Sequence, residues 1–182
     1  MAIWEIRIVR FVEQRRDSDG KRRTVGRYQV YHDGVAQPHP LLSGATAESR
    51  GPGANAPKGN GRRVEPGRYP LWTQNGTKYK TIDYSPSLNQ ASIPRPGIEL
   101  GNTAERKEIL IHPGIGFLAS IGCINLCSSL PHANEPIDYA GSRQRVIAVI
   151  DDMRAFLHSH FPTQNGKAIT DAFAVIDGEP AF

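Results

Sequence analysis

The sequence has few cysteines and no long apolar segment. Only two of its 182 residues are cysteine, which is too few for a framework of disulfides. No apolar run approaches the roughly 20 residues that a membrane-spanning helix needs. The first residues, MAIWEIRIVRFVEQRR, alternate apolar and charged side chains and lack the continuous apolar core of a signal peptide. These absences predict a protein made in the cytoplasm without a signal peptide or a transmembrane segment, and the length of 182 residues predicts a single domain over residues 1–182.

The charge is moderately positive, with a formal net charge of +4 at pH 7. Basic residues flank the short segment DSDG, at Arg15, Arg16 and the run 21–23. We interpret this cluster as the solvated tip of a hairpin in preference to a nucleic-acid-binding patch. The excess of positive charge is also compatible with an anionic partner such as a cell-wall polymer.

The pattern of apolar residues predicts a mainly β (α+β) protein. In residues 1–42, apolar residues alternate on both sides of a turn at Gly20, as in a β-hairpin. Residues 43–63 contain five glycines and two prolines and hardly any bulky apolar side chain, which predicts a flexible loop. Residues 64–182 resume the β pattern and form the expected catalytic-like core.

Two further elements are predicted within that core. The segment EILIHPG is typical of a short buried strand that ends at His112. The segment SRQRVIAVIDDMRAFLHSHF has apolar residues at helical spacing and a serine, Ser142, that suits the N-cap. The tail, ITDAFAVIDGEPAF, predicts a last short strand.

His112 and Cys123 are the strongest candidates for chemistry. The ten residues PGIGFLASIG separate them, so a strand followed by a tight loop can bring the two side chains together. A cysteine acts as a nucleophile when it is a thiolate, and a neighbouring histidine can take its proton. Because Gly122 has no side chain, a substrate carbonyl can approach the backbone N–H groups beside Cys123, as in an oxyanion hole.

Two less reactive interpretations stay open on the residues alone. A cysteine in apolar surroundings is commonly a small core residue, and a histidine is commonly a hydrogen-bonded structural residue. A structural zinc site could use His112, Cys123, Cys127 and His132, although their spacing is unlike that of zinc knuckles.

Two motifs give this chain a resemblance to a known family. The segment SIGCINL (120–126), preceded by IHPG, resembles the active-site signature of the L,D-transpeptidase (YkuD-like) superfamily. The upstream segment VEPGRY (64–69) is similar to the motif that opens a strand in those domains. The closest likeness is to the divergent branch that includes type VI secretion effectors attacking peptidoglycan. The resemblance implies a β-sandwich or barrel with one principal helix near the C-terminus.

The resemblance also assigns roles by position. Cys123 would be the nucleophile, His112 its base, and Pro113 the residue whose carbonyl orients that histidine. The N–H groups of Ile121, Gly122 and Cys123 would form the oxyanion hole, and Ser120 would shape the loop.

Two positions depart from the family pattern. Ile121 replaces the histidine of the signature, and Asn125 replaces its frequent arginine. These two changes affect the expected recognition of substrate more than the thiol chemistry, because the pair that carries the chemistry is intact. Asn125 and Arg143 are the candidate substrate-binding residues, although a surface position for Arg143 is the simpler interpretation.

The implied function is L,D-carboxypeptidase or L,D-transpeptidase activity on peptidoglycan tetrapeptide stems, with no metal or other cofactor. The site of action would be the periplasm or cell wall, reached by type VI secretion in the toxin interpretation. An immunity protein or a secretion-system component would then be a partner. The alternative is a non-catalytic cell-wall-binding or partner-binding module on the same scaffold.

Overall fold

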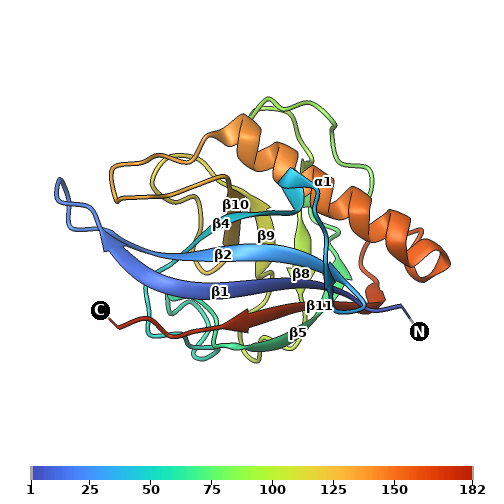
Figure 1. Cartoon of the computed structure of the whole chain (residues 1–182), viewed down its shortest axis with the longest axis horizontal. Helices are drawn as coiled ribbons and strands as arrows, with labels where there is room; N and C mark the ends of the chain where they lie inside the picture. Colours follow the sequence, from blue (N-terminus) through green and yellow to red (C-terminus); the bar gives the residue numbers. More distant parts are fainter. Residues whose placement is uncertain (1, 182) are drawn as a thin grey trace.

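The computed structural model describes residues 2–181 and is mostly β with one α-helix in that range (Figure 1). The strands are β1 (Trp4–Arg15), β2 (Arg22–His32), β3 (Val35–Ala36), β4 (Ser43–Glu48), β5 (Gly67–Thr73), β6 (Tyr79–Lys80), β7 (Arg95–Pro96), β8 (Ile98–Leu100), β9 (Leu110–Pro113), β10 (Ile124–Cys127) and β11 (Ala168–Asp177). The helices are α1 (Tyr139–Leu157) and two 3₁₀ turns, η1 (Pro40–Leu42) and η2 (His158–His160). The expected mainly β chain with one principal helix near its C-terminus is confirmed.

Eight strands close into a barrel. Their order is β1-β11-β5-β8-β9-β10-β4-β2, and pairing of β2 with β1 closes the circle. The short strand β3 also pairs with β2. Strands β6 and β7 pair with each other in a separate small sheet. Closure leaves no free edge along the eight strands, which removes the template for edge-to-edge aggregation.

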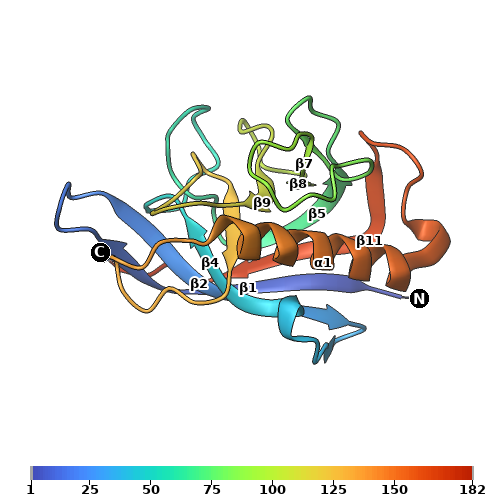
Figure 2. The same cartoon turned by 90° about the horizontal axis from the view of Figure 1, so that it is seen from above.

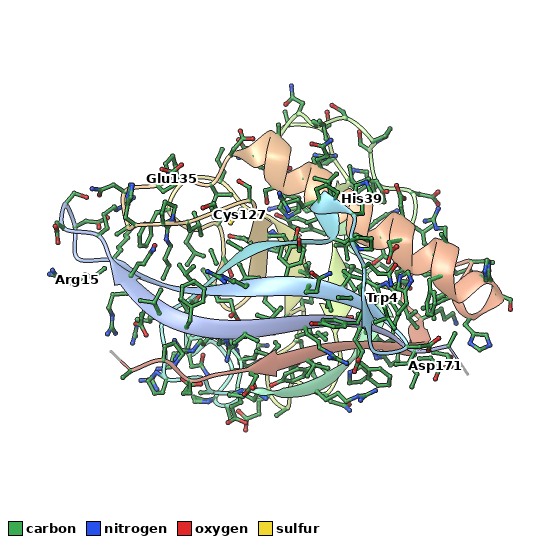
Figure 3. The ribbon with its side chains drawn as sticks, viewed as in Figure 1. Trp4, Arg15, His39, Cys127, Glu135 and Asp171 are labelled. Atoms are coloured by element: carbon green, nitrogen blue, oxygen red, sulfur yellow. The ribbon has the colours of Figure 1, made fainter. Side chains whose placement is uncertain are left out.

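The N-terminal hairpin is the longest part of the barrel and projects beyond it at one end (Figure 1). Its register runs from Trp4 opposite His32 to Arg15 opposite Arg22, as the alternation in the sequence predicts. Side chains of one face, Trp4 and Ile8 among them, are fully buried in the barrel core. Arg15 lies at the projecting end, away from the helix (Figure 3).

The prediction of a flexible loop over residues 43–63 is wrong for its first six residues. Residues 43–48 form β4, which pairs with β2 on one side and β10 on the other. The segment is poor in bulky residues because there is no room for them: a Cβ at Gly44 would lie 2.4 Å from the carbonyl oxygen of Cys127. Residues 49–63 form no strand or helix, and Arg63 at their end is buried.

The predicted helix is confirmed, but it begins earlier than Ser142. Asp138 is the N-cap, and its carboxylate accepts a hydrogen bond from the Gly141 N–H at 2.9 Å. Ser142 lies in the first turn and is buried; its hydroxyl donates to the Leu126 carbonyl and accepts from the Gly114 N–H. The helix packs against β9 and β10, the strands that carry the candidate site (Figure 2).

A buried ionic network joins β1 to β4 across the intervening strand β2. The Arg10 guanidinium donates two hydrogen bonds to Glu48, at 2.6 and 2.8 Å, and both side chains are fully buried. Arg63 contacts Glu13 and Glu179 beside this pair. The network ties residues 49–63 and the C-terminal segment to the barrel wall.

No helix within residues 2–181 has both the length and the apolar character needed to cross a bilayer.

Candidate active site

The parallel pairing of β9 and β10 brings His112 and Cys123 to one face of the barrel wall. Ile124 pairs with Ile111 and Asn125 with His112, so the residue before β10, Cys123, stands beside Leu110. Side chains two residues apart in a strand point to the same face. The His112 and Cys123 side chains are therefore diagonal neighbours, and the Leu110 N–H donates a hydrogen bond to Cys123 Sγ at 3.3 Å.

Both side chains line one small cavity of about 300 Å³. The rest of its wall comes from the turn after β5, from β6 and from the segment before β9, and the full set is Gln74, Gly76, Thr77, Lys78, Tyr79, Glu108, Leu110, His112 and Cys123. Its volume lies at the lower end of the range that is typical of small-ligand pockets.

His112 is held in one orientation. Its Nδ1 lies 2.7 Å from the Pro113 carbonyl oxygen, so Nδ1–H is the donor and Nε2 keeps its lone pair. The Tyr79 ring packs against the imidazole with 4.7 Å between ring centroids. Burial lowers the pKa of His112 to about 4, and the charge of Arg95 adds to that effect. The imidazole is therefore neutral at pH 7 and can accept a proton at Nε2.

Cys123 is a neutral thiol in the resting protein. Burial raises its pKa above the ordinary value, while the Leu110 N–H and the charge of Arg106 act in the opposite direction. The thiol donates a weak hydrogen bond to the Glu108 carbonyl, with 3.6 Å between sulfur and oxygen. Across residues 2–181, no hydrogen bond links His112 to Cys123. The pair is thus a neutral thiol and a neutral imidazole that share a cavity.

Arg106 is a component of the site that sequence reasoning missed. The side chain is buried, and its guanidinium donates to the carbonyls of Ala54 at 3.2 Å and Arg62 at 2.5 Å, and more weakly to Ile121 at 3.5 Å. None of the ion pairs in the described part of the chain includes Arg106. Its charge therefore remains available to stabilise a thiolate at Cys123. No periodicity marks residue 106, so a lone arginine there gives no signal in the sequence.

The loop before Cys123 is fixed by polar contacts. The Ser120 hydroxyl donates to the Cys123 carbonyl at 2.6 Å, while the Ile121 side chain is 78% exposed. The Gly122 N–H donates to Ser49 Oγ at 2.9 Å. Because that amide is already bonded, the expectation that Gly122 donates to an oxyanion is not met in this structure. Ser49 comes from the segment after β4 and gave no signal in the sequence.

Asn125 and Arg143 do not line the cavity, so the geometry of the site does not support the expectation that they bind substrate. The fully buried Asn125 accepts a hydrogen bond from the Ala119 N–H at 3.0 Å and braces the loop. Arg143 is fully buried as well, which also overturns the surface interpretation. Its guanidinium donates to three carbonyls of the loop 85–92 and to the Tyr139 hydroxyl. The long side chain reaches inward from the helix and holds that loop.

The structure does not assemble the four side chains of the zinc interpretation. Within residues 2–181, no three His, Cys, Asp or Glu side chains are grouped closely enough to hold a metal ion. Cys127, labelled in Figure 3, is packed in a small buried cluster with Val25, Ala45 and Leu130. Burial raises the pKa of this thiol to about 12, so it is a core residue.

Comparison of the chain with protein-family models, with curated proteins and with solved structures found no match. The geometry of the cavity and the motif resemblance are therefore the two grounds for a proposed function.

Proposed function

We propose that this protein is a cysteine acyltransferase or peptidase, with Cys123 as the nucleophile and His112 as the base. The observation that carries the proposal is the shared cavity, in which His112 turns a free Nε2 away from the Pro113 carbonyl. The motif resemblance names the same pair and the same carbonyl. It also supplies the proposed substrate, a peptidoglycan tetrapeptide stem, and the finer fold assignment to an L,D-transpeptidase-like barrel.

The proposed first step transfers an acyl group to sulfur. As Cys123 Sγ attacks the substrate carbonyl carbon, the thiol proton passes to His112 Nε2. Attack and proton transfer are coupled. The pKa of the Cys123 thiol is raised and that of His112 is lowered, so a separated thiolate and imidazolium are disfavoured in the free protein. The C–N bond then breaks, the proton moves from His112 to the leaving amine, and a thioester remains.

The second step releases the acyl group. Water or an amine attacks the thioester, His112 takes the proton of the attacking group, and the proton returns to sulfur. Water gives a carboxypeptidase, and a D-amino acid gives an exchange reaction. In both steps the N–H groups of Cys123 and Ile121 are the proposed donors to the oxyanion, because that of Gly122 is bonded to Ser49.

This activity would be exerted in the periplasm or cell wall. A toxin delivered by type VI secretion is the interpretation that the resemblance favours, with an immunity protein as its partner. The positive net charge of +4 is compatible with binding to an anionic wall.

The test is mass spectrometry of purified tetrapeptide muropeptides incubated with the protein, with and without an added D-amino acid. We expect the terminal D-residue to be lost or exchanged by the wild type and retained with Cys123→Ala and His112→Gln. Loss without exchange identifies a hydrolase. Unchanged muropeptides in every arm, with muropeptide binding retained by Cys123→Ala, would refute the enzyme and support the binding module.

A further inference from the structure

Glu108 occupies an unusual position beside the candidate nucleophile. It lines the cavity, and its backbone carbonyl accepts the hydrogen bond from the Cys123 thiol at 3.6 Å. Its φ of +56° lies in the left-handed region that side-chain-bearing residues rarely adopt. Strained residues of this kind concentrate at ligand-binding and catalytic sites. The conformation fixes Glu108 at the mouth of the cavity, where its side chain is exposed.

The Glu108 carboxylate has no cationic partner in the described part of the chain. Its polar contact is the Gln74 amide, with 3.5 Å between nitrogen and oxygen. Lys78 lines the same cavity but forms no ion pair with Glu108 within residues 2–181. A second carboxylate, that of Glu99, lies close by, and its pKa is raised by burial and by the charge of Glu108. Glu108 therefore lines the cavity with a second carboxylate near it, although Glu99 itself is not part of the cavity wall.

This negative charge opposes the chemistry proposed for Cys123. A carboxylate near a thiol disfavours the thiolate, and Glu108 raises the pKa of Cys123 in this way. Arg106 acts in the opposite direction, and His112 is neutral. An unpaired carboxylate is thus a disadvantage for the nucleophile until a cation binds beside it.

We propose that Glu108 binds an ammonium group of the ligand, so that the ligand itself removes the charge that restrains the Cys123 thiol. The ligand class is a peptide with a free side-chain amine at the residue whose carbonyl is attacked. This inference rests on the proposed function for the identity of that carbonyl, but the binding of the amine does not depend on turnover.

The first experiment measures alkylation of Cys123 in the free protein by iodoacetamide, a neutral reagent, with peptide mapping to quantify the label. In Glu108→Gln we expect alkylation at least about threefold faster than in the wild type, because removing a nearby negative charge lowers the pKa of the Cys123 thiol and favours the thiolate. The matched control is Glu105→Gln, which removes the same charge from the same segment. Glu105 accepts a hydrogen bond from the Lys58 N–H and does not line the cavity. An equal rate in Glu108→Gln and wild type would overturn the proposal.

The second experiment measures binding in the Cys123→Ala background, where no turnover occurs. The probes are two tetrapeptides that differ only at the third residue, L-lysine in one and Nε-acetyl-L-lysine in the other. We expect the free amine to bind at least about fivefold more tightly, and Glu108→Gln to abolish that preference while Glu105→Gln keeps it. Equal affinity for both peptides would overturn the proposal. If the preference for the amine is retained but the wild type shows no turnover, the proposed acyl transfer is refuted and the binding of the amine by Glu108 is not.

Discussion

Gly122→Ala tests the packing beneath the candidate nucleophile. Gly122 has a φ of +101°, and an added Cβ would lie 1.9 Å from Arg106 Nη2 and 3.2 Å from the Arg62 carbonyl oxygen. The left-handed backbone costs an alanine about 1–2 kcal/mol. Arg106 must also move away from the Ala54 and Arg62 carbonyls, and each buried group left unpaired costs about 1–3 kcal/mol. We expect the substitution to lower the free energy of unfolding by about 3–8 kcal/mol, a large part of a domain's total stability.

Gly116→Ala is the matched control for this substitution. Gly116 lies in the same loop with a φ of +66°, and an added Cβ there would meet nothing within 4 Å. Only the cost of the left-handed backbone applies, so the free energy of unfolding should fall by about 1–2 kcal/mol. Urea denaturation of the two variants separates backbone strain from the displacement of Arg106.

A double-mutant cycle makes the argument specific. In an Arg106→Met background the clash is relieved, so Gly122→Ala should cost about 1–2 kcal/mol, as it does at Gly116. The reasoning is refuted if Gly122→Ala and Gly116→Ala destabilise the protein equally. It is also refuted if Arg106→Met leaves the cost of Gly122→Ala unchanged.

Three other expectations follow from buried groups. Because the pKa of His112 is about 4 when folded and about 6.5 when unfolded, the unfolded chain binds more protons between these values. The free energy of unfolding should therefore fall by about 3 kcal/mol as the pH drops from 6.5 to 4. Urea denaturation at a series of pH values should show that this fall is lost in His112→Asn and kept in the exposed control His132→Asn. Arg10→Met should cost about 3–5 kcal/mol in urea denaturation by leaving Glu48 buried and unpaired, and Glu48→Leu should restore stability in the double variant. In native protein at pH 8, mass spectrometry should find the alkylating label on one thiol only, since Cys127 is buried with a pKa of about 12; label at both sites would contradict this.

Elements with a clear alternation were predictable from the sequence, and those without one were not. The hairpin of β1 and β2 follows from apolar residues at every second position, which the barrel buries on one face. β4 was missed because neighbouring backbone leaves no room for large side chains there, and a run of small residues looks like a loop. Ser142 suited an N-cap by residue type, but Asp138 lies at the actual end of the helix and takes that role.

Some residues of the candidate site were likewise predictable from the sequence, and others were not. His112 and Cys123 could be found because their residue types carry chemistry and their motif resembles that of a known family. Arg106 and Glu108 could not, since both lie in the segment between β8 and β9, where charged residues follow no period and resemble an ordinary surface loop. The burial of Asn125 could not be foreseen, because sequence position does not show that its amide is used to hold the Ala119 N–H of the loop.

The short connection between β9 and β10 explains why the electrostatics of this site depend on neighbouring loops. Parallel strands generally need a crossover of a dozen or more residues, yet here residues 114–123 make the connection without a helix or strand of their own. Cys123 therefore lies at the end of a loop whose shape is set by its anchors, among them Asn125 and Ser49. The sulfur held there is within the electrostatic influence of both the Arg106 cation and the Glu108 carboxylate. The two charges act on the pKa of this neutral thiol in opposite directions, so we expect the charge of a bound ligand to add to their balance.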